Sequence, residues 1–147
     1  MKSKINETSP LKGIIIFLII TGIVFLLKAR HNELDTARAV LGGLIQSNQS
    51  ITGLLKWDKL KAVGADIGST YLAYKTDKER NDYKKYFIRG FSAGFKEVKG
   101  NYKEFTNWRF YEKTAQKTVV AVDYRDKILL FTLPKNEKKI TDIQWKE

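Results

Sequence analysis

Hydrophobic and polar positions divide the chain into two parts. Residues 13–27 form an uncharged run in which nine of fifteen residues are Ile or Leu, and a lysine stands at each end. As a helix this run spans roughly 22 Å, and including Leu11 and Ala29 extends it to about 28 Å, which suits a thin bilayer. The pattern predicts a transmembrane helix over residues 13–29. Its anchoring residues are Gly13, Phe17, Leu18, Phe25 and Leu27, and its interfacial residues are Lys12, Lys28 and Arg30.

A cleaved signal peptide is the alternative interpretation of this segment, because a basic leader precedes the apolar run. The residues after Leu27 (KARH) contain no small-x-small cleavage motif, which favours an uncleaved anchor. Three cations lie close on each side of the run, so the positive-inside rule gives almost no preference for either orientation. We expect residues 1–12 to be a short cytoplasmic tail, and the domain that follows the transmembrane helix to be extracytoplasmic.

The apolar spacing behind the anchor is helical as far as about residue 100. Residues 30–50 are expected to form a stalk or first helix, and the globular domain is expected over residues 51–147. Apolar residues three and four apart predict a second helix over 51–74. A third helix is predicted after a cap at Thr76 or Asp77. Four glycines at helical spacing predict close packing or a partner face: Gly64, Gly68, Gly90 and Gly94.

The period changes from 3.6 to 2 after Asn101. Strands are predicted within residues 107–147, over 107–113, 117–125, 127–133 and 139–146. Their short connections favour an antiparallel meander of about four strands. The sequence therefore predicts an α+β domain in which about three helices pack on this sheet, with the aromatic stripe of residues 83–98 across one sheet face.

This order of elements resembles the cone-shaped helix-and-sheet fold of the NTF2-like superfamily. More distantly, it resembles the domains of VirB8-like secretion proteins, which follow a single membrane helix. The resemblance covers roughly residues 32–147 and rests on the order of elements alone, so no site residues carry over. Lys12-Gly13 followed by an apolar helix is also similar to type IV pilins, although Leu18 stands where pilins normally have Glu.

The chain is basic, with 27 Lys and Arg against 16 Asp and Glu. Residues 31–147 carry 22 cations against 15 acids, a net charge of +7. Such a charge attracts anionic lipid or wall polymer. The cations are interspersed with acids, which is equally typical of a solvated surface. No clustered basic and stacking aromatic motif occurs, so no specific nucleic acid is expected as a partner.

Residue types that commonly take part in catalysis or bind metals, such as Cys and His, are scarce in this chain. There is no Cys and His31 is the single His, so disulfides are excluded and a zinc site is improbable. No phosphate-binding glycine motif occurs. We expect neither a cofactor nor an enzyme, although an unrecognised carboxylate site remains an alternative. Seven aromatic residues are candidates for lining a cavity inside a cone: Tyr83, Phe87, Phe91, Trp108, Phe110, Tyr124 and Trp145.

These observations favour a non-enzymatic, single-pass scaffold or assembly subunit of a membrane or envelope complex, of a secretion type or similar. Its expected partners are the lipid bilayer, other subunits of the complex and further copies of itself. The alternatives are a ligand-binding, sensor or carrier module that uses the aromatic cone, and a pilin-like minor subunit.

Overall fold

The computed structural model describes residues 14–16, 18–19, 21 and 32–146, and it divides the chain into two units, 1–32 and 33–147. In the first unit residues 14–16, 18–19 and 21 are helical, and Leu18 among them is exposed. The other predicted anchor and interfacial residues lie outside the described ones. None of the helices among the described residues combines the length and the hydrophobicity needed to cross a membrane.

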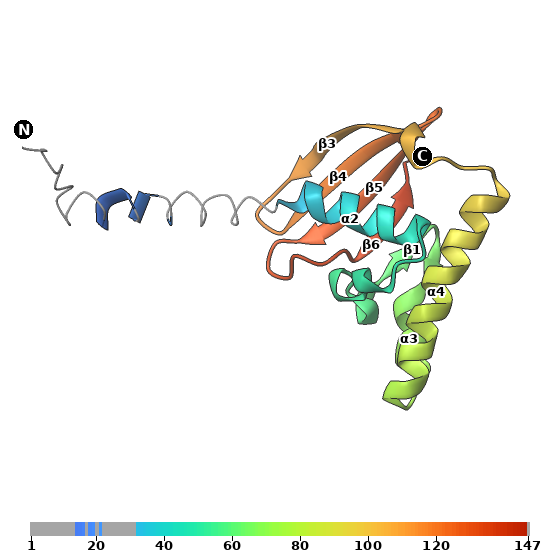
Figure 1. Cartoon of the computed structure of the whole chain (residues 1–147). Helices are drawn as coiled ribbons and strands as arrows, with labels where there is room; N and C mark the ends of the chain where they lie inside the picture. The colour runs from blue at the N-terminus through green and yellow to red at the C-terminus, as the bar shows by residue number, and fades with distance from the viewer. Residues whose placement is uncertain (1–13, 17, 20, 22–31, 147) are drawn as a thin grey trace, which may run out of the picture. The chain divides into compact units, whose positions relative to one another are not determined.

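The second unit contains one mixed sheet of six strands, together with the helices that pack on it (Figure 1). The strand order is β2-β1-β6-β5-β4-β3, and all neighbours are antiparallel except β1 and β6, which run parallel. The strands are β1 (Lys61–Ala62), β2 (Ala65–Asp66), β3 (Phe105–Lys113), β4 (Lys117–Tyr124), β5 (Lys127–Pro134) and β6 (Asp142–Trp145). The α+β class is confirmed. The expectation of four antiparallel strands was wrong, because β1 and β2 extend the β3–β6 meander into a mixed sheet.

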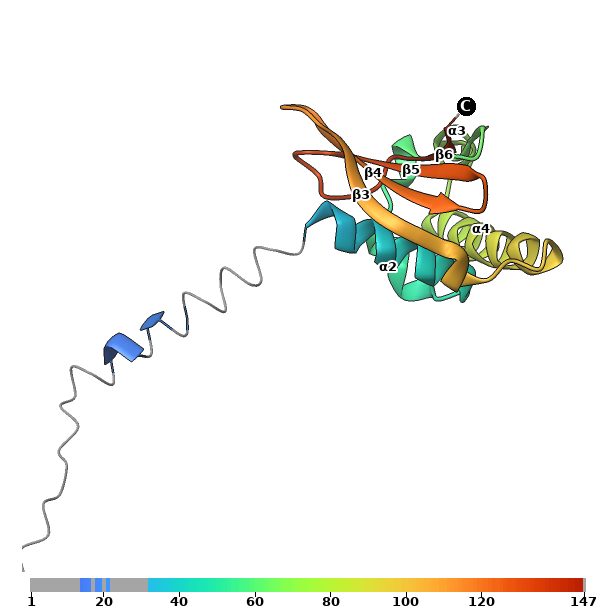
Figure 2. The same cartoon turned by 90° about the horizontal axis from the view of Figure 1, so that it is seen from above.

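The helix α2 (Glu33–Ile45) lies on one face of the sheet (Figure 2). Ala37, Val40, Leu41 and Leu44 of this helix are fully buried, in one core with the sheet residues Val120 and Phe131. The segment 30–50, expected as a stalk or first helix, thus contributes the centre of the core, and the compact unit begins at Glu33 rather than at residue 51.

The helix α4 (Asp77–Glu97) has the ends that its sequence predicts. Thr76 and Glu79 form a reciprocal capping box at its start. At its end Lys99 adopts a left-handed φ of 51°, and the Gly100 N–H donates to the Phe95 carbonyl. The left-handed residue is therefore Lys99, one position before the glycine of the predicted Gly100-Asn101 cap.

The aromatic stripe of α4 does not cross the sheet as expected. The helix packs beside the C-terminal end of α2, where the buried Ser92 hydroxyl donates to the Ile45 carbonyl at 2.7 Å. Phe95 reaches the sheet and contacts the rings of Phe105 and Tyr124. Since α2 already covers this face of the sheet, the rest of the stripe packs against helices and turns instead.

The predicted helix over 51–74 is replaced by short elements. They are the 3-10 turns η1 (Gln49–Leu54) and η2 (Trp57–Lys59), the β1–β2 hairpin, and the two-turn helix α3 (Ile67–Ala73). A third 3-10 turn, η3 (Tyr102–Glu104), follows α4. The buried residues Ile51, Leu55 and Leu60 are four and five positions apart, and the successive turns direct all three into one core. The apolar residues of this segment are therefore buried as expected, but the backbone that carries them is not one continuous helix.

Adjacent glycines in α2 give a matched test of this packing. A Cβ at Gly43 would collide with the Ile51 side chain of η1, whereas a Cβ at Gly42 would meet only the Tyr102 ring at 3.9 Å. Overpacking a core costs about 1–3 kcal/mol, and Gly to Ala in a helix gains about 1 kcal/mol. We expect Gly43→Ala to lower the free energy of unfolding and Gly42→Ala to raise it, measured by urea denaturation of the full chain. Equal effects at the two positions would contradict the Gly43–Ile51 contact.

Candidate functional site

The outward side of α4 carries a row of four residues spaced four apart, Tyr86, Gly90, Gly94 and Val98, here called the α4 strip. Tyr86 is 74% exposed and Val98 is 59% exposed. Apart from the backbone of α4 itself, no atom lies within 4 Å of a Cβ built on Gly90 or Gly94. Nothing else in the described part of the chain therefore packs on these two glycines, which leave bare helix backbone between Tyr86 and Val98.

The other two glycines singled out from the sequence have different roles. The Cβ position of Gly68, in α3, would be 2.8 Å from the Asp58 carbonyl oxygen, so this glycine allows α3 to pack closely on η2. Gly64 has a φ of 84° and forms the β1–β2 turn together with Val63. These positions serve the internal packing of the domain, whereas Gly90 and Gly94 face outward.

The seven candidate cavity aromatics are distributed over the domain. Phe87 meets Trp57 edge-on at 5.7 Å between ring centroids, and Trp108 stacks on Phe131 at 6.0 Å. Phe91 packs against the core. Phe110 is exposed, and the Lys113 ammonium lies over its ring. Tyr83 lines a hollow of about 380 Å³ that also contains Tyr86, and Tyr124 and Trp145 line a separate hollow of about 310 Å³. The aromatic residues thus belong to several sites.

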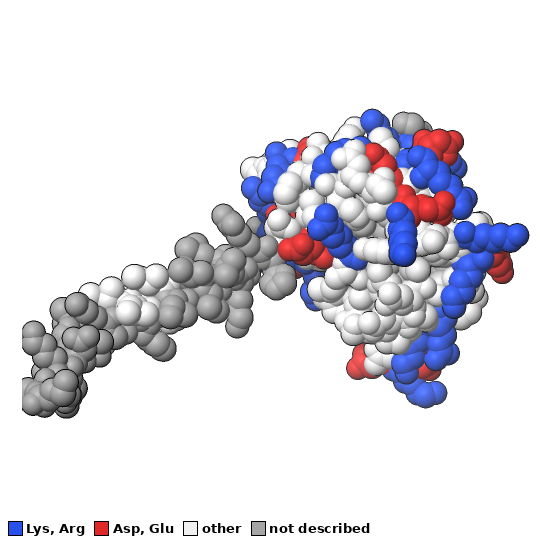
Figure 3. Space-filling model, turned by 45° about the horizontal axis from the view of Figure 1, so that its top comes forward, with Lys and Arg blue, Asp and Glu red and all other residues white. Residues whose placement is uncertain are grey.

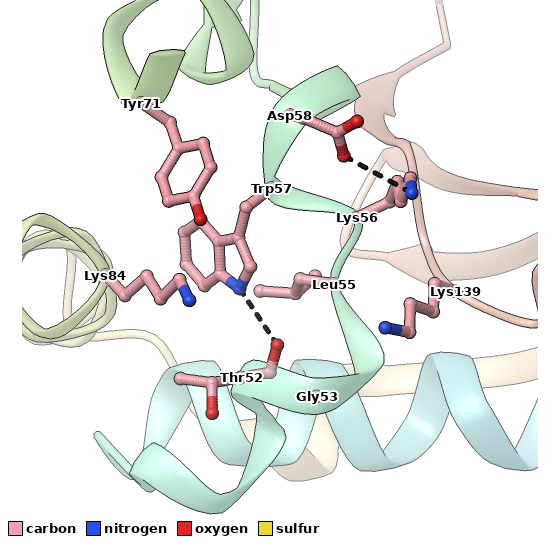
Figure 4. Close-up of a pocket in the computed structure, with 9 residues that line it drawn as sticks. All are labelled: Thr52, Gly53, Leu55, Lys56, Trp57, Asp58, Tyr71, Lys84 and Lys139. Carbon is pink, nitrogen blue, oxygen red and sulfur yellow. Dashed lines mark hydrogen bonds and ion pairs between the residues drawn. The ribbon is translucent and has the colours of Figure 1, made fainter. Parts of the chain in front are cut away.

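A third hollow, of about 390 Å³, lies beside Trp57 (Figure 4). The indole is 6% exposed, and its N–H donates to the Thr52 carbonyl at 2.9 Å. Lys84 of α4 holds its ammonium 5.9 Å from the Trp57 ring centroid and 5.4 Å from that of Tyr71. Lys139, from the β5–β6 connection, points inward from the opposite side in Figure 4. Sequence reasoning missed this site, because its lysines are 55 residues apart and belong to no motif.

Some basic residues elsewhere in the domain have acidic neighbours. On the face that Figure 3 shows, Lys and Arg side chains are scattered with Asp and Glu among them. Arg125 pairs with Glu104 at 3.1 Å, and Arg109 pairs with Asp123 at 2.8 Å. These two pairs are partly exposed, so each contributes little to stability. The hollow at Trp57 is distinct from such surfaces because it collects several lysines around one opening.

Two carboxylates whose pKa values are shifted in opposite directions, Asp66 and Asp142, lie at the β1–β2 edge of the sheet. Burial raises the pKa of Asp142, and hydrogen bonds from Ser69 lower the pKa of Asp66, which caps α3. Both residues line one open hollow at the β1–β2 edge. Among the described residues there is no cluster of three His, Asp or Glu side chains suited to a metal ion. The shift of Asp66 follows from its role as a helix cap, which gives it a structural explanation.

The comparisons with known proteins identify no relative. No protein-family model, no curated protein and no solved structure matches this chain. The resemblance to NTF2-like and VirB8-like domains therefore stays a prediction.

Asp123 provides a pH-dependent test of the sheet surface. Hydrogen bonds from the Asn107 amide and then from the Arg109 guanidinium, both at 2.8 Å, hold the pKa of Asp123 below 3.8. A lowered folded-state pKa contributes stability above the unfolded pKa, and this contribution is lost as the pH falls through the folded value. Between about pH 5 and pH 2 we therefore expect the free energy of unfolding to fall more steeply for the wild type than for Asp123→Asn. Parallel pH profiles would argue against these bonds.

Proposed function

We propose that this chain is a non-enzymatic, single-pass membrane scaffold subunit whose α+β domain assembles through the α4 strip. The observation that carries the proposal is the uncovered helix backbone at Gly90 and Gly94, flanked by the exposed Tyr86. Glycine in the middle of a helix costs about 1 kcal/mol relative to alanine. Two such glycines on an outward face gain nothing for the isolated domain, but they allow another helix to approach closely. The apolar run over residues 13–27 supports the membrane anchor.

The occupant that fits the α4 strip best is α4 of a second copy, packed antiparallel. The start of this helix mixes acids with bases (DKERND), and its end carries Lys96 and Lys99 with Glu97 between them. An antiparallel pair places the positive dipole end of each helix beside the negative dipole end of the other, which is favourable. With the crossing at Gly90, Tyr86 of one copy lies opposite Gly94 of the other. Rows of residues four apart pack into each other's grooves in the commonest class of helix contact.

A cysteine at the proposed crossing tests this arrangement directly, because the chain has no native Cys. We expect Gly90→Cys, in the full chain in a neutral detergent with mild oxidant, to form a disulfide-linked dimer. Helices that cross at glycine approach closely enough for the Cα separation that a disulfide needs, about 4.4–6.8 Å. The measurement is the fraction of dimer on a non-reducing gel over time.

Lys96→Cys is the matched control, because it lies on the same helix but points away from the strip. We expect its dimer to form at least about tenfold more slowly, which corresponds to about 1.4 kcal/mol. Adding Gly94→Gln to Gly90→Cys fills the place opposite Tyr86 and should slow the reaction as well. If the two single cysteines cross-linked at the same rate, assembly of copies through this strip would be refuted.

The proposed topology places the N-terminus in the cytoplasm and the domain outside. We expect an impermeant thiol reagent applied to intact cells to label Lys138→Cys, an exposed position in the β5–β6 connection, and not Lys4→Cys. Both single-cysteine chains should be labelled after the membrane is permeabilised. Labelling of position 4 alone in intact cells would reverse the orientation, and it would place the scaffold's partners in the cytoplasm.

A further inference from the structure

We infer that the hollow beside Trp57, here called the Trp57 site, binds a phosphate group. Four separate segments of the chain form it: the η1–η2 region, α3, α4 and the β5–β6 connection. Its volume of about 390 Å³ lies within the range of small-molecule sites. The inference concerns side chains that lie outside the α4 strip, so it does not depend on assembly through that strip.

The lining of the site has an excess of positive charge. Lys56, Lys84 and Lys139 contribute three ammonium groups, and Asp58 is the single acid of the lining. Lys56 lies 3.6 Å from the Asp58 carboxylate and 3.8 Å from that of Glu137. Within the part of the chain that the structure describes, neither Lys84 nor Lys139 has a carboxylate within 4 Å. These two ammonium groups enter the hollow without a counter-charge, which an anion would supply.

The aromatic rings place Lys84 for this role. Its ammonium lies close to both the Trp57 and the Tyr71 rings, within the range of a cation–π contact. It also donates a hydrogen bond to the Asn81 side chain, which is long at 3.4 Å. The rings restrict where the ammonium can move but supply no negative charge. The lysine is therefore oriented before a ligand arrives, which lowers the entropic cost of binding.

The available donors indicate which anion fits. The Trp57 N–H and the Thr52 hydroxyl are already used, in bonds to the carbonyls of Thr52 and Gln49. The Tyr71 hydroxyl and the ammonium groups remain, and the ammonium groups act as point charges without the planar fork of arginine. Two or three lysines around one opening favour an anion that bears more than one charge on closely spaced oxygens. A phosphate monoester has this character, and a single carboxylate has less of it.

The test is calorimetric titration of the full chain in neutral detergent micelles with phenyl phosphate, the phosphate monoester of phenol. We expect saturable binding with one site per chain. In the double variant Lys84→Gln/Lys139→Gln the affinity should fall at least about tenfold, or about 1.4 kcal/mol.

The matched control is Lys85→Gln/Lys138→Gln, which removes the same charge from the neighbouring positions in the sequence, outside the site. Screening at about 0.15 M salt limits the long-range effect of such charges, so the control should change the affinity by less than about threefold. Equal losses in the two double variants, or no saturable binding by the wild type, would overturn the inference.

A second arm distinguishes the sources of the phosphate group. Micelles are doped either with phosphatidic acid, a monoester headgroup, or with phosphatidylglycerol as the diester control, at matched surface charge. If a lipid headgroup reaches the Trp57 site, phosphatidic acid should weaken the apparent affinity for phenyl phosphate more than phosphatidylglycerol does. Equal effects would identify a soluble phosphate ester as the ligand. Each result presupposes the site, and the first arm alone decides whether it exists.

Discussion

The arrangement of the domain depends on how α2 is held against the sheet. Its apolar face is fully buried, and the two polar side chains buried in the described domain fix its ends. The Thr118 hydroxyl, on β4, donates to the Glu33 carboxylate at the start of the helix, and the Ser92 hydroxyl of α4 donates to the Ile45 carbonyl at its end. A buried hydroxyl without a partner is costly, so these bonds specify one position for the helix. The place of α4 follows from this position.

The outward face of α4 is a consequence of that packing. Because α2 occupies the face of the sheet, α4 packs beside it and buries Ile88 and Ser92, and its opposite side remains uncovered. The helix does not depend on a partner to begin and end where it does, since both ends are capped by its own residues. A long, independently capped helix with small residues on its outer side suits a docking element, and this is the physical basis of the scaffold proposal.

The Trp57 site arises from the irregular region between α2 and α4. Short turns place Trp57 at the junction of η2, α3 and α4, where its indole contacts Tyr71 and Phe87. The parallel contact of the segment around Leu55 with Ile140 brings the β5–β6 connection to the same place. One lysine from α4 and one from that connection then line a single hollow. Together with Lys56 they outnumber the one acid of the lining, Asp58, and this local excess of positive charge favours an anion.

The sequence alone determined the α+β class, the extent of α4 with its Thr76 cap, and the β3–β6 meander, because each rests on a local periodicity or a cap. It did not determine the region 51–74, where helix-like spacing arises from successive turns, nor β1 and β2, which at two residues each are too short to show a period. Whether Gly68 or Gly90 faced the interior, and whether Lys84 and Lys139 met, depended on contacts between distant segments. Only the tertiary structure decided these points, since periodicity identifies the buried side of an element but not the element that covers it.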